Sequence, residues 1–170
     1  MTNTRKYLKV LFVVPLLLSV ILSNTTNAAE QPTIMLIGPA GLVRSGELLP
    51  IEVRIDSHGE IINAVEASVR YSPAVFTVER VGREQSPLTL WPEEPTTDAQ
   101  VGTVHFIGGR PGGFVAVNTI IATLYVRASV GGSLAMAFDA EQTAFYLNDG
   151  LGTRLAVETA PLSLVVADAL

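Results

Sequence analysis

The amino-acid sequence predicts an all-β domain, a sandwich or barrel built from roughly nine short strands. Three observations support this prediction. Short runs are apolar or alternate between apolar and polar residues, each run ends at Gly, Pro, Asn or Asp, and no stretch repeats with the period of a helix. Hydrophobic residues make up 48% of the 170 residues and charged residues 16%, which supplies one core and argues against disorder.

The first half of the chain predicts four strands separated by turns. The clearest of them, 62–71, has a period of two, with Val65, Ala67 and Val69 on one face and polar residues on the other. Pro73 then interrupts the chain, because proline removes a backbone donor from a strand. The four predicted strands cover residues 33–37, 48–56, 62–71 and 75–81.

The second half begins with a loop, 82–100, that is rich in Pro, Glu and Thr. The glycine-rich segment 108–113 predicts a wide turn with positive φ at some positions, because it lacks the Lys-Ser/Thr ending of a phosphate-binding loop and no helix follows it. Further strands are predicted at 101–107, 119–128, 133–138, 144–147 and 156–166. In 119–128, alternation directs Ile120, Ala122, Leu124 and Val126 inward and Ile121, Thr123, Tyr125 and Arg127 outward.

Residues 1–29 have the features of a secretory signal peptide, and residues 30–170 then form the mature domain. Three basic residues stand among the first nine positions, and the apolar run 10–22 follows. At about 13 residues this run is shorter than the ~20 that a membrane-spanning helix needs, which favours cleavage after Ala28 or Ala29 over an uncleaved anchor. No second hydrophobic span follows. The sequence therefore predicts a protein that is secreted or held at the cell surface, without a membrane span in the mature chain.

The charge of the mature part excludes several classes of partner. From Glu30 onward, eight arginines stand against 16 acidic residues, which gives a formal net charge of −8. A net acidic domain without lysine lacks the basic stripe that a phosphate backbone requires, so nucleic-acid binding is excluded. Adsorption to an anionic membrane surface is excluded for the same reason. The chain contains no cysteine, which excludes disulfides and cysteine-built zinc sites.

Four segments of the chain are informative through their order and spacing. The first is 46–55, a Gly-Glu pair followed by a strand, and the second is 62–73, an alternating strand that ends in Tyr-Ser-Pro. The others are 102–106 and 120–128, and the latter is similar to the strand that follows the family's long loop. Together the resembling residues span about 33–166, nearly all of the mature chain. In this order and spacing the four segments resemble a cohesin domain. The resemblance implies a nine-stranded jelly-roll β-sandwich, a fold shared with many carbohydrate-binding modules.

The same resemblance implies a receptor for another protein. Cohesins of cellulosome scaffolds hold calcium-dependent dockerin modules borne by enzymes, and single cohesin-like domains also occur in exported proteins outside cellulosomes. The implied function is an exported, non-catalytic module that binds a dockerin-like partner in a polysaccharide-related or cell-surface context. In the cohesin fold, strands 62–71, 101–107 and 119–128 lie together in one sheet, and their outward residues form the expected binding face. That face consists of Glu66, Ser68, Arg70, His105, Thr123, Tyr125 and Arg127.

Residue types that often serve catalysis lack the required arrangement here. Glu93 and Glu94 are adjacent between two prolines, whereas a glycosidase needs carboxyl groups that face each other about 5–10 Å apart. His58 lies in an Asp-Ser-His-Gly turn and His105 points outward from a strand, so neither has an evident nucleophile and orienting acid. The two histidines are also too far apart in the sequence to match the ligand spacing of a zinc site. The sequence therefore predicts that the protein is not an enzyme and needs no cofactor.

Two alternative functions remain open. Direct polysaccharide binding would centre on Trp91 and Tyr125, although aromatic residues are only 6% of the chain and Trp91 fits equally well as a plug over one end of the core. A purely structural unit of an envelope or surface assembly would instead self-associate through an edge strand.

The loop 148–153 raises the question of calcium. Asn148 and Asp149 supply oxygen ligands, and Asp139 or Glu141 would have to complete a set of six to eight. The same loop fits an ordinary Asn-Asp-Gly hairpin turn, which is the interpretation we favour.

Overall fold

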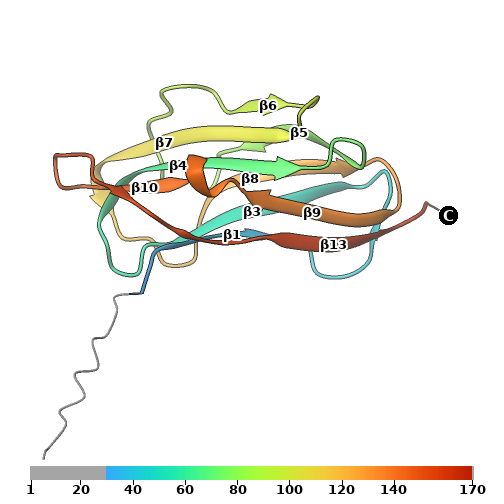
Figure 1. The fold of residues 1–170 in the computed structure, drawn as a ribbon, viewed down its shortest axis with the longest axis horizontal. Helices are drawn as coiled ribbons and strands as arrows, with labels where there is room; N and C mark the ends of the chain where they lie inside the picture. The colour runs from blue at the N-terminus through green and yellow to red at the C-terminus, as the bar shows by residue number, and fades with distance from the viewer. Residues whose placement is uncertain (1–29, 170) are drawn as a thin grey trace, which may run out of the picture.

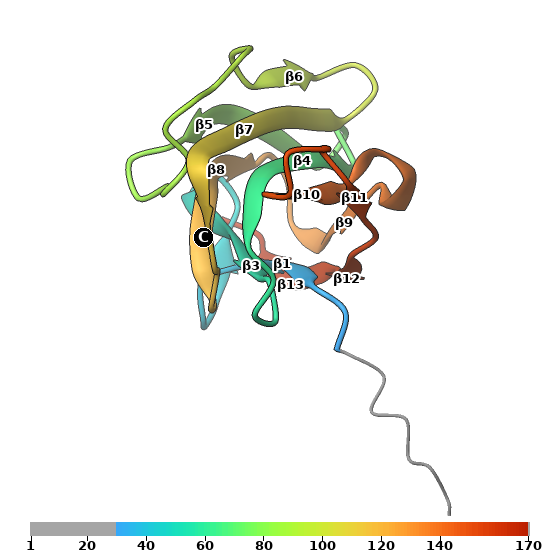
Figure 2. The ribbon, with the colours of Figure 1, turned by 90° about the vertical axis from the view of Figure 1, so that its left-hand side faces the viewer.

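The computed structural model describes residues 30–169 and consists of two β-sheets packed face to face (Figures 1 and 2). The signal peptide predicted at 1–29 lies outside the described residues. One sheet, sheet A, has five strands. In spatial order they are β12 (Glu158–Ala160), β1 (Thr33–Ile37), β3 (Leu48–Asp56), β8 (Thr119–Ala128) and β5 (Phe76–Gly82).

The other sheet, sheet B, is centred on β4 (Ile62–Tyr71). One edge of β4 pairs with β10 (Ala144–Leu147) in its first half and with β9 (Gly132–Phe138) in its second half. The short 3₁₀ helix η1 (Ala140–Gln142) lies between β9 and β10 in the chain. The other edge of β4 pairs with β7, beyond which β6 lies at the rim of the molecule (Figure 2). The remaining strands of this sheet are β6 (Thr96–Asp98), β7 (Thr103–Phe114), β11 (Arg154–Leu155), β13 (Leu162–Ala167) and β2 (Val43–Arg44).

The core fills the space between the two sheets with the inward residues of the alternating strands. β3 buries Leu49, Ile51, Val53 and Ile55, and β9 and residues 103–109 of β7 follow the same period of two. The largest fully buried side chains are Phe76, Phe106 and Phe145. The all-β sandwich expected from the sequence is confirmed. Among residues 30–169, no helix is long and apolar enough to cross a membrane.

The glycine-rich segment is not the turn that the sequence predicts, because β7 continues through it to Phe114. The pairing with β4 advances from Gly109 to Phe114 while β4 moves only from Ala64 to Ile62, so β7 holds its extra residues as a bulge. Positive φ values occur inside this bulge, 83° at Gly112 and 70° at Gly113, as the composition suggests. The chain reverses afterwards, at 115–118.

The predicted strand 156–166 is two strands in different sheets. β12 pairs with β1 in sheet A, and β13 pairs with β9 in sheet B. Pro161 separates them, because its nitrogen has no hydrogen to donate to either ladder. The predicted loop 82–100 likewise contains β6 and a buried Leu88.

Strand β8 departs from strict alternation near its start. Its pairing with β3 shifts by one residue between Ala122 and Ile120, and both Ile121 and Ala122 are buried. A bulge of this kind places two consecutive residues on the same side of a strand. The prediction that Ile121 points outward is therefore wrong, whereas Thr123, Tyr125 and Arg127 do alternate with buried neighbours.

A buried serine ties two loops together, and its loss is expected to cost stability. The Ser57 hydroxyl is fully buried; it donates to the Glu60 carbonyl (2.7 Å) and accepts from the Ala116 backbone N–H (3.0 Å). Ser57→Ala leaves that buried N–H without its acceptor, so the free energy of unfolding should fall by about 1–3 kcal/mol. Urea denaturation measures this difference. Ser133→Ala, at an exposed position, should change it by less than about 0.5 kcal/mol, and equal effects of the two changes would contradict the prediction.

Candidate functional site

The seven residues expected to form one binding face lie on two different sheets. β4 and β7 pair with each other in sheet B, but β8 pairs with β3 and β5 in sheet A. The expectation that all three strands share a sheet is therefore wrong. The physical reason is that the chain crosses from one sheet to the other at 115–118, so β7 and β8 are consecutive in sequence but lie in opposite layers.

Sheet B brings four of the seven residues together on its outer surface. Cross-strand pairs place Glu66 opposite Ile107, Ser68 opposite His105, and Arg70 opposite Thr103. These outward residues of the two strands form what we call the β4–β7 face. It comprises Ala64, Glu66, Ser68, Arg70, Thr103, His105, Ile107 and Gly109.

One half of the β4–β7 face is polar and encloses a hollow of about 530 Å³. Ser68 lies at its floor and is only 3% exposed, and its backbone N–H donates to the Thr143 hydroxyl (3.3 Å). Arg70 extends over the surface and binds the Asp139 carboxylate through Nε (3.1 Å) and Nη2. The lining residues are Ser68, Arg70, Tyr71, Val101, Thr103, His105, Asp139 and Gln142.

Glu66 sits in the middle of the face as an acceptor with two polar neighbours. The Tyr146 hydroxyl donates to Glu66 Oε2 (2.7 Å), and Nε2 of His105 lies 4.0 Å from Glu66 Oε1. The hydrogen bond to the carboxylate, together with burial, raises the pKa of Tyr146 above its ordinary value. The polar half therefore presents a half-buried carboxylate, an imidazole and an arginine side by side, which is a set suited to hydrogen bonding with a protein surface.

The ion pair between Arg70 and Asp139 predicts a pH-dependent stability. The hydrogen bond from Arg70 is the main reason why the pKa of Asp139 lies below its ordinary value, and the backbone N–H of Glu141 also contributes. A carboxylate with a lowered pKa stabilises the fold above its unfolded pKa and loses that contribution as the pH falls through its folded pKa. The difference in unfolding free energy between wild type and Arg70→Ala should therefore shrink at acid pH.

NMR titration of the Asp139 carboxyl measures the same effect directly. Arg70→Ala should raise the pKa of Asp139 toward its ordinary value, whereas Arg44→Ala, on the distant β2, should leave it unchanged. An unchanged Asp139 pKa in Arg70→Ala would refute this account of the pair.

The outer surface of sheet A presents charges that are already paired. Arg127 bonds to the Glu79 carboxylate through Nε (2.5 Å) and to the Gly46 carbonyl through Nη1 (2.6 Å). Arg80 lies 3.5 Å above the Tyr125 ring and pairs with Glu84 (3.0 Å). These contacts are typical of a solvent-exposed sheet face on which the arginines pair with neighbouring groups of the same chain.

Trp91 packs against the core. Its ring nitrogen donates to the Leu88 carbonyl (3.1 Å), and its ring centroid lies 6.2 Å from that of Phe106. The Arg83 guanidinium lies 5.1 Å from the same ring. These contacts favour the plug interpretation of Trp91, because a sugar-binding tryptophan needs an open ring face.

Asp149 organises the loop 148–153 as a turn. Its Oδ1 accepts from the backbone N–H of Leu151 (2.8 Å) and of Gly152 (3.0 Å), and its Oδ2 accepts from the Thr153 hydroxyl. The Asn148 side chain donates to the Gly112 carbonyl (3.2 Å). Within the part of the chain that the structure describes, no group of three or more His, Asp or Glu is placed to hold a metal ion. The calcium site at Asn148 and Asp149 stays a prediction, and the geometry favours the turn.

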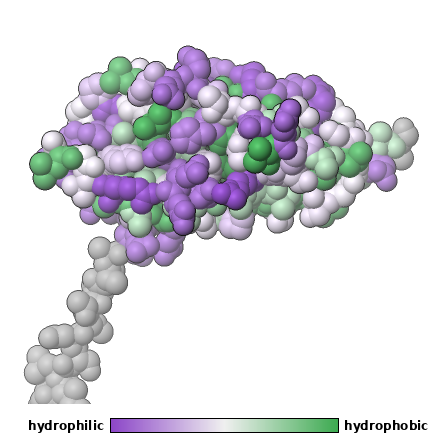
Figure 3. Space-filling model, turned by 45° about the horizontal axis from the view of Figure 1, so that its top comes forward, coloured by the Kyte–Doolittle hydropathy of each residue, from purple (hydrophilic) through white to green (hydrophobic). Residues whose placement is uncertain are grey.

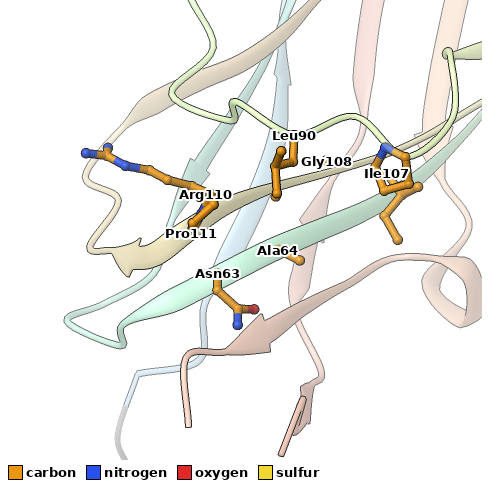
Figure 4. A pocket seen from close by; sticks show the side chains of 9 residues that line it. Asn63, Ala64, Leu90, Ile107, Gly108, Arg110 and Pro111 are labelled. Atoms are coloured by element: carbon orange, nitrogen blue, oxygen red, sulfur yellow. The ribbon is translucent and has the colours of Figure 1, made fainter. Parts of the chain in front are cut away.

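The other half of the β4–β7 face is apolar, and sequence reasoning missed it. The loop before β6 folds back onto β7, where Leu90 forms a bridge with Gly109. A hollow of about 430 Å³ results (Figure 4). Its lining residues are Asn63, Ala64, Leu90, Pro92, Ile107, Gly108, Gly109, Arg110 and Pro111. The available signal was Gly109 opposite the small Ala64, which leaves the outer surface of the sheet bare at this point.

No family model matches the chain, and no curated protein matches it either. Solved structures of cohesin modules do match. One is the Coh-OlpC module of a type I cohesin–dockerin complex from Clostridium thermocellum, with a TM-score of 0.66 and 11% identity over 83% of this chain and 97% of that chain. Another is the third cohesin of ScaC, in complex with the ScaB dockerin, from Acetivibrio cellulolyticus, with a TM-score of 0.63 and 12% identity over 80% and 99%.

A third match is the non-cellulosomal cohesin of the archaeon Archaeoglobus fulgidus, with a TM-score of 0.63 and 14% identity over 81% of this chain and 94% of that chain. In all three matches the other chain is covered almost completely, so the likeness extends over the whole sandwich. The chain has the cohesin fold, which confirms the resemblance drawn from its four sequence segments.

Proposed function

We propose that the chain is an exported, non-catalytic receptor module that binds a protein partner on its β4–β7 face. Two of the similar solved structures are complexes of a cohesin with a dockerin, so a dockerin-like module is the partner class that the fold suggests. The export step rests on the signal peptide predicted at 1–29.

The observation that carries this proposal is the contrast between the two outer surfaces. The β4–β7 face has a polar half around Glu66, Arg70 and His105 and an apolar half around Ile107, both on one continuous pair of strands. Polar and apolar residues are interspersed on the side of the molecule that carries β6 and β7 (Figure 3). A mixed surface of this kind is typical of protein recognition. On sheet A, by contrast, no residue of β5 or β8 lines either hollow.

A binding panel tests the class of partner. The purified protein is immobilised and presented with calcium-loaded dockerin modules from several sources and, separately, with insoluble and soluble polysaccharides. We expect saturable binding of at least one dockerin module and no specific retention on any polysaccharide. Retention on a polysaccharide that is lost in Trp91→Ala, together with no binding to any dockerin module, would overturn the proposal in favour of a carbohydrate-binding module. Concentration-dependent self-association as the only activity would instead indicate a structural unit.

A further inference from the structure

Backbone hydrogen bonds join the two walls of the apolar hollow on the β4–β7 face. Gly109 and Leu90 exchange backbone hydrogen bonds (2.8 and 2.9 Å), and the N–H of Thr89 also donates to the Gly109 carbonyl (2.9 Å). These bonds attach the loop wall that carries Leu90 and Pro92 to the strand wall that carries Ile107. Backbone hydrogen bonds therefore hold the two walls of the hollow together.

Its chemistry is almost entirely hydrocarbon. Leu90 projects over the strands (Figure 4) and is 55% exposed. Ala64 and Gly109, which pair with each other, carry little or no side chain, and Pro92 and Pro111 also line the hollow. Its volume of about 430 Å³ lies within the ~300–1,000 Å³ of ligand-binding clefts. Apolar surface left uncovered in this way favours a partner that buries it.

The rim of the hollow carries a single cation. Arg110 is exposed and leads away from the hollow at one end (Figure 4), with its guanidinium 5.6 Å from the Phe114 ring. No carboxylate among residues 30–169 forms a salt bridge with it. Five other arginines in the same part of the chain do have a carboxylate partner, namely Arg54, Arg70, Arg80, Arg83 and Arg127.

We propose that the hollow receives one branched aliphatic side chain of the protein partner and that Arg110 binds a carboxylate close to it in the partner's sequence. This inference rests on the proposed function, because it places the partner on the β4–β7 face. A buried aliphatic anchor beside a charge-assisted hydrogen bond supplies both affinity and orientation. The lining has no aromatic ring on which a sugar could stack, which is why a protein side chain is the occupant that fits.

A randomised seven-residue peptide library displayed on phage tests the chemistry without knowledge of the natural partner. The library is selected on the immobilised protein and on three variants: Leu90→Glu, Arg110→Glu and, as the control, Arg44→Glu on the distant β2. Leu90 and Arg110 are exposed, so their replacement does not disturb the core. On the wild type we expect enrichment of Leu, Ile or Val with Asp or Glu nearby. Arg110→Glu should exchange the acidic preference for Lys or Arg, and Arg44→Glu should change nothing.

A synthetic peptide with the consensus sequence is then used to measure how strongly each substitution changes the binding affinity. Its affinity should fall by about tenfold or more on Leu90→Glu, since a central apolar anchor is a typical hot spot. The proposal is overturned if wild-type protein enriches no aliphatic and acidic combination, or if Arg110→Glu keeps the acidic preference. It is also overturned if Arg44→Glu alters the motif as much as Arg110→Glu does.

Failure of this inference and failure of the proposed function are distinguishable. If a dockerin module binds wild type, Leu90→Glu and Arg110→Glu equally well, the hollow is not the anchor site, but the receptor function stands. If the peptides show the expected motif while no dockerin module binds, the hollow is a peptide site and the dockerin-like partner is wrong.

Discussion

Replacing Phe106 by alanine is expected to lower the free energy of unfolding by about 3–5 kcal/mol. Phe106 is 1% exposed, points inward from the middle of β7, and its ring lies against that of Trp91, which closes the core from the loop before β6. Truncation removes the buried ring and leaves a cavity between strands whose backbones are fixed by two ladders. The surrounding structure can therefore collapse only in part, which is the condition for a large loss.

Urea denaturation followed by tryptophan fluorescence measures this loss. The matched control is His105→Ala, the neighbouring outward residue of the same strand, for which a change of less than about 1 kcal/mol is expected. If Phe106→Ala does not fold, Ile55→Val at a fully buried position of β3 should still cost about 0.5–1.5 kcal/mol. A loss below about 1 kcal/mol in a folded Phe106→Ala protein would contradict the position of Phe106 in the core.

Gly102→Ala is the second change with a large expected effect. Gly102 has φ = 79°, a left-handed conformation that costs a non-glycine residue about 1–3 kcal/mol. In addition, a Cβ at this position would lie 2.1 Å from the Tyr71 carbonyl oxygen, which cannot move freely because it belongs to the backbone of β4. The Tyr71 N–H also donates to the Gly102 carbonyl (2.8 Å) and so ties the turn before β7 to β4. The substitution should therefore displace the end of β4 as well as strain the turn.

Gly150→Ala separates the two causes. Gly150 has nearly the same φ, 77°, but nothing lies within 4 Å of a Cβ added there. Gly150→Ala should therefore lower the free energy of unfolding by only the cost of the left-handed backbone, about 1 kcal/mol. Gly102→Ala should lower it by more than about twice as much. Equal losses in thermal or urea denaturation would show that the close approach to Tyr71 has no energetic consequence.

The period of two allowed most strands to be predicted from the sequence. It located β3, β4 and β8 at their observed bounds, because alternating burial on a pleated strand leaves a local pattern. The bulges were not predictable in this way. The extra residues of β7 at 110–113 and the doubled burial at Ile121 depend on the pairing with a distant strand, which local alternation does not encode.

The candidate site was predicted only in part for the same reason. Glu66, Ser68, Arg70 and His105 are outward on their strands, as expected, and pairing of β4 with β7 brings them together. The assignment of β8 to the same sheet failed, because sheet membership depends on where the chain crosses between layers. Asp139 beside η1 and Leu90 in the loop before β6 also line the two hollows. Their segments have no regular alternation, so only the tertiary fold shows that they belong to the site.

The most direct test of the receptor account compares two matched substitutions, each of which places a bulky side chain on one of the two outer surfaces. Thr103 borders the polar hollow of the β4–β7 face, and Thr123 points outward from β8 in sheet A; both are half-buried threonines on strands. Each is replaced by arginine, and the affinity for a dockerin module that binds wild type is measured by calorimetry, after thermal denaturation has shown that both variants fold. Thr103→Arg should weaken binding by about tenfold or more, and Thr123→Arg should change it by less than about twofold. Loss of binding in Thr123→Arg, with Thr103→Arg unaffected, would place the partner on sheet A and contradict the account.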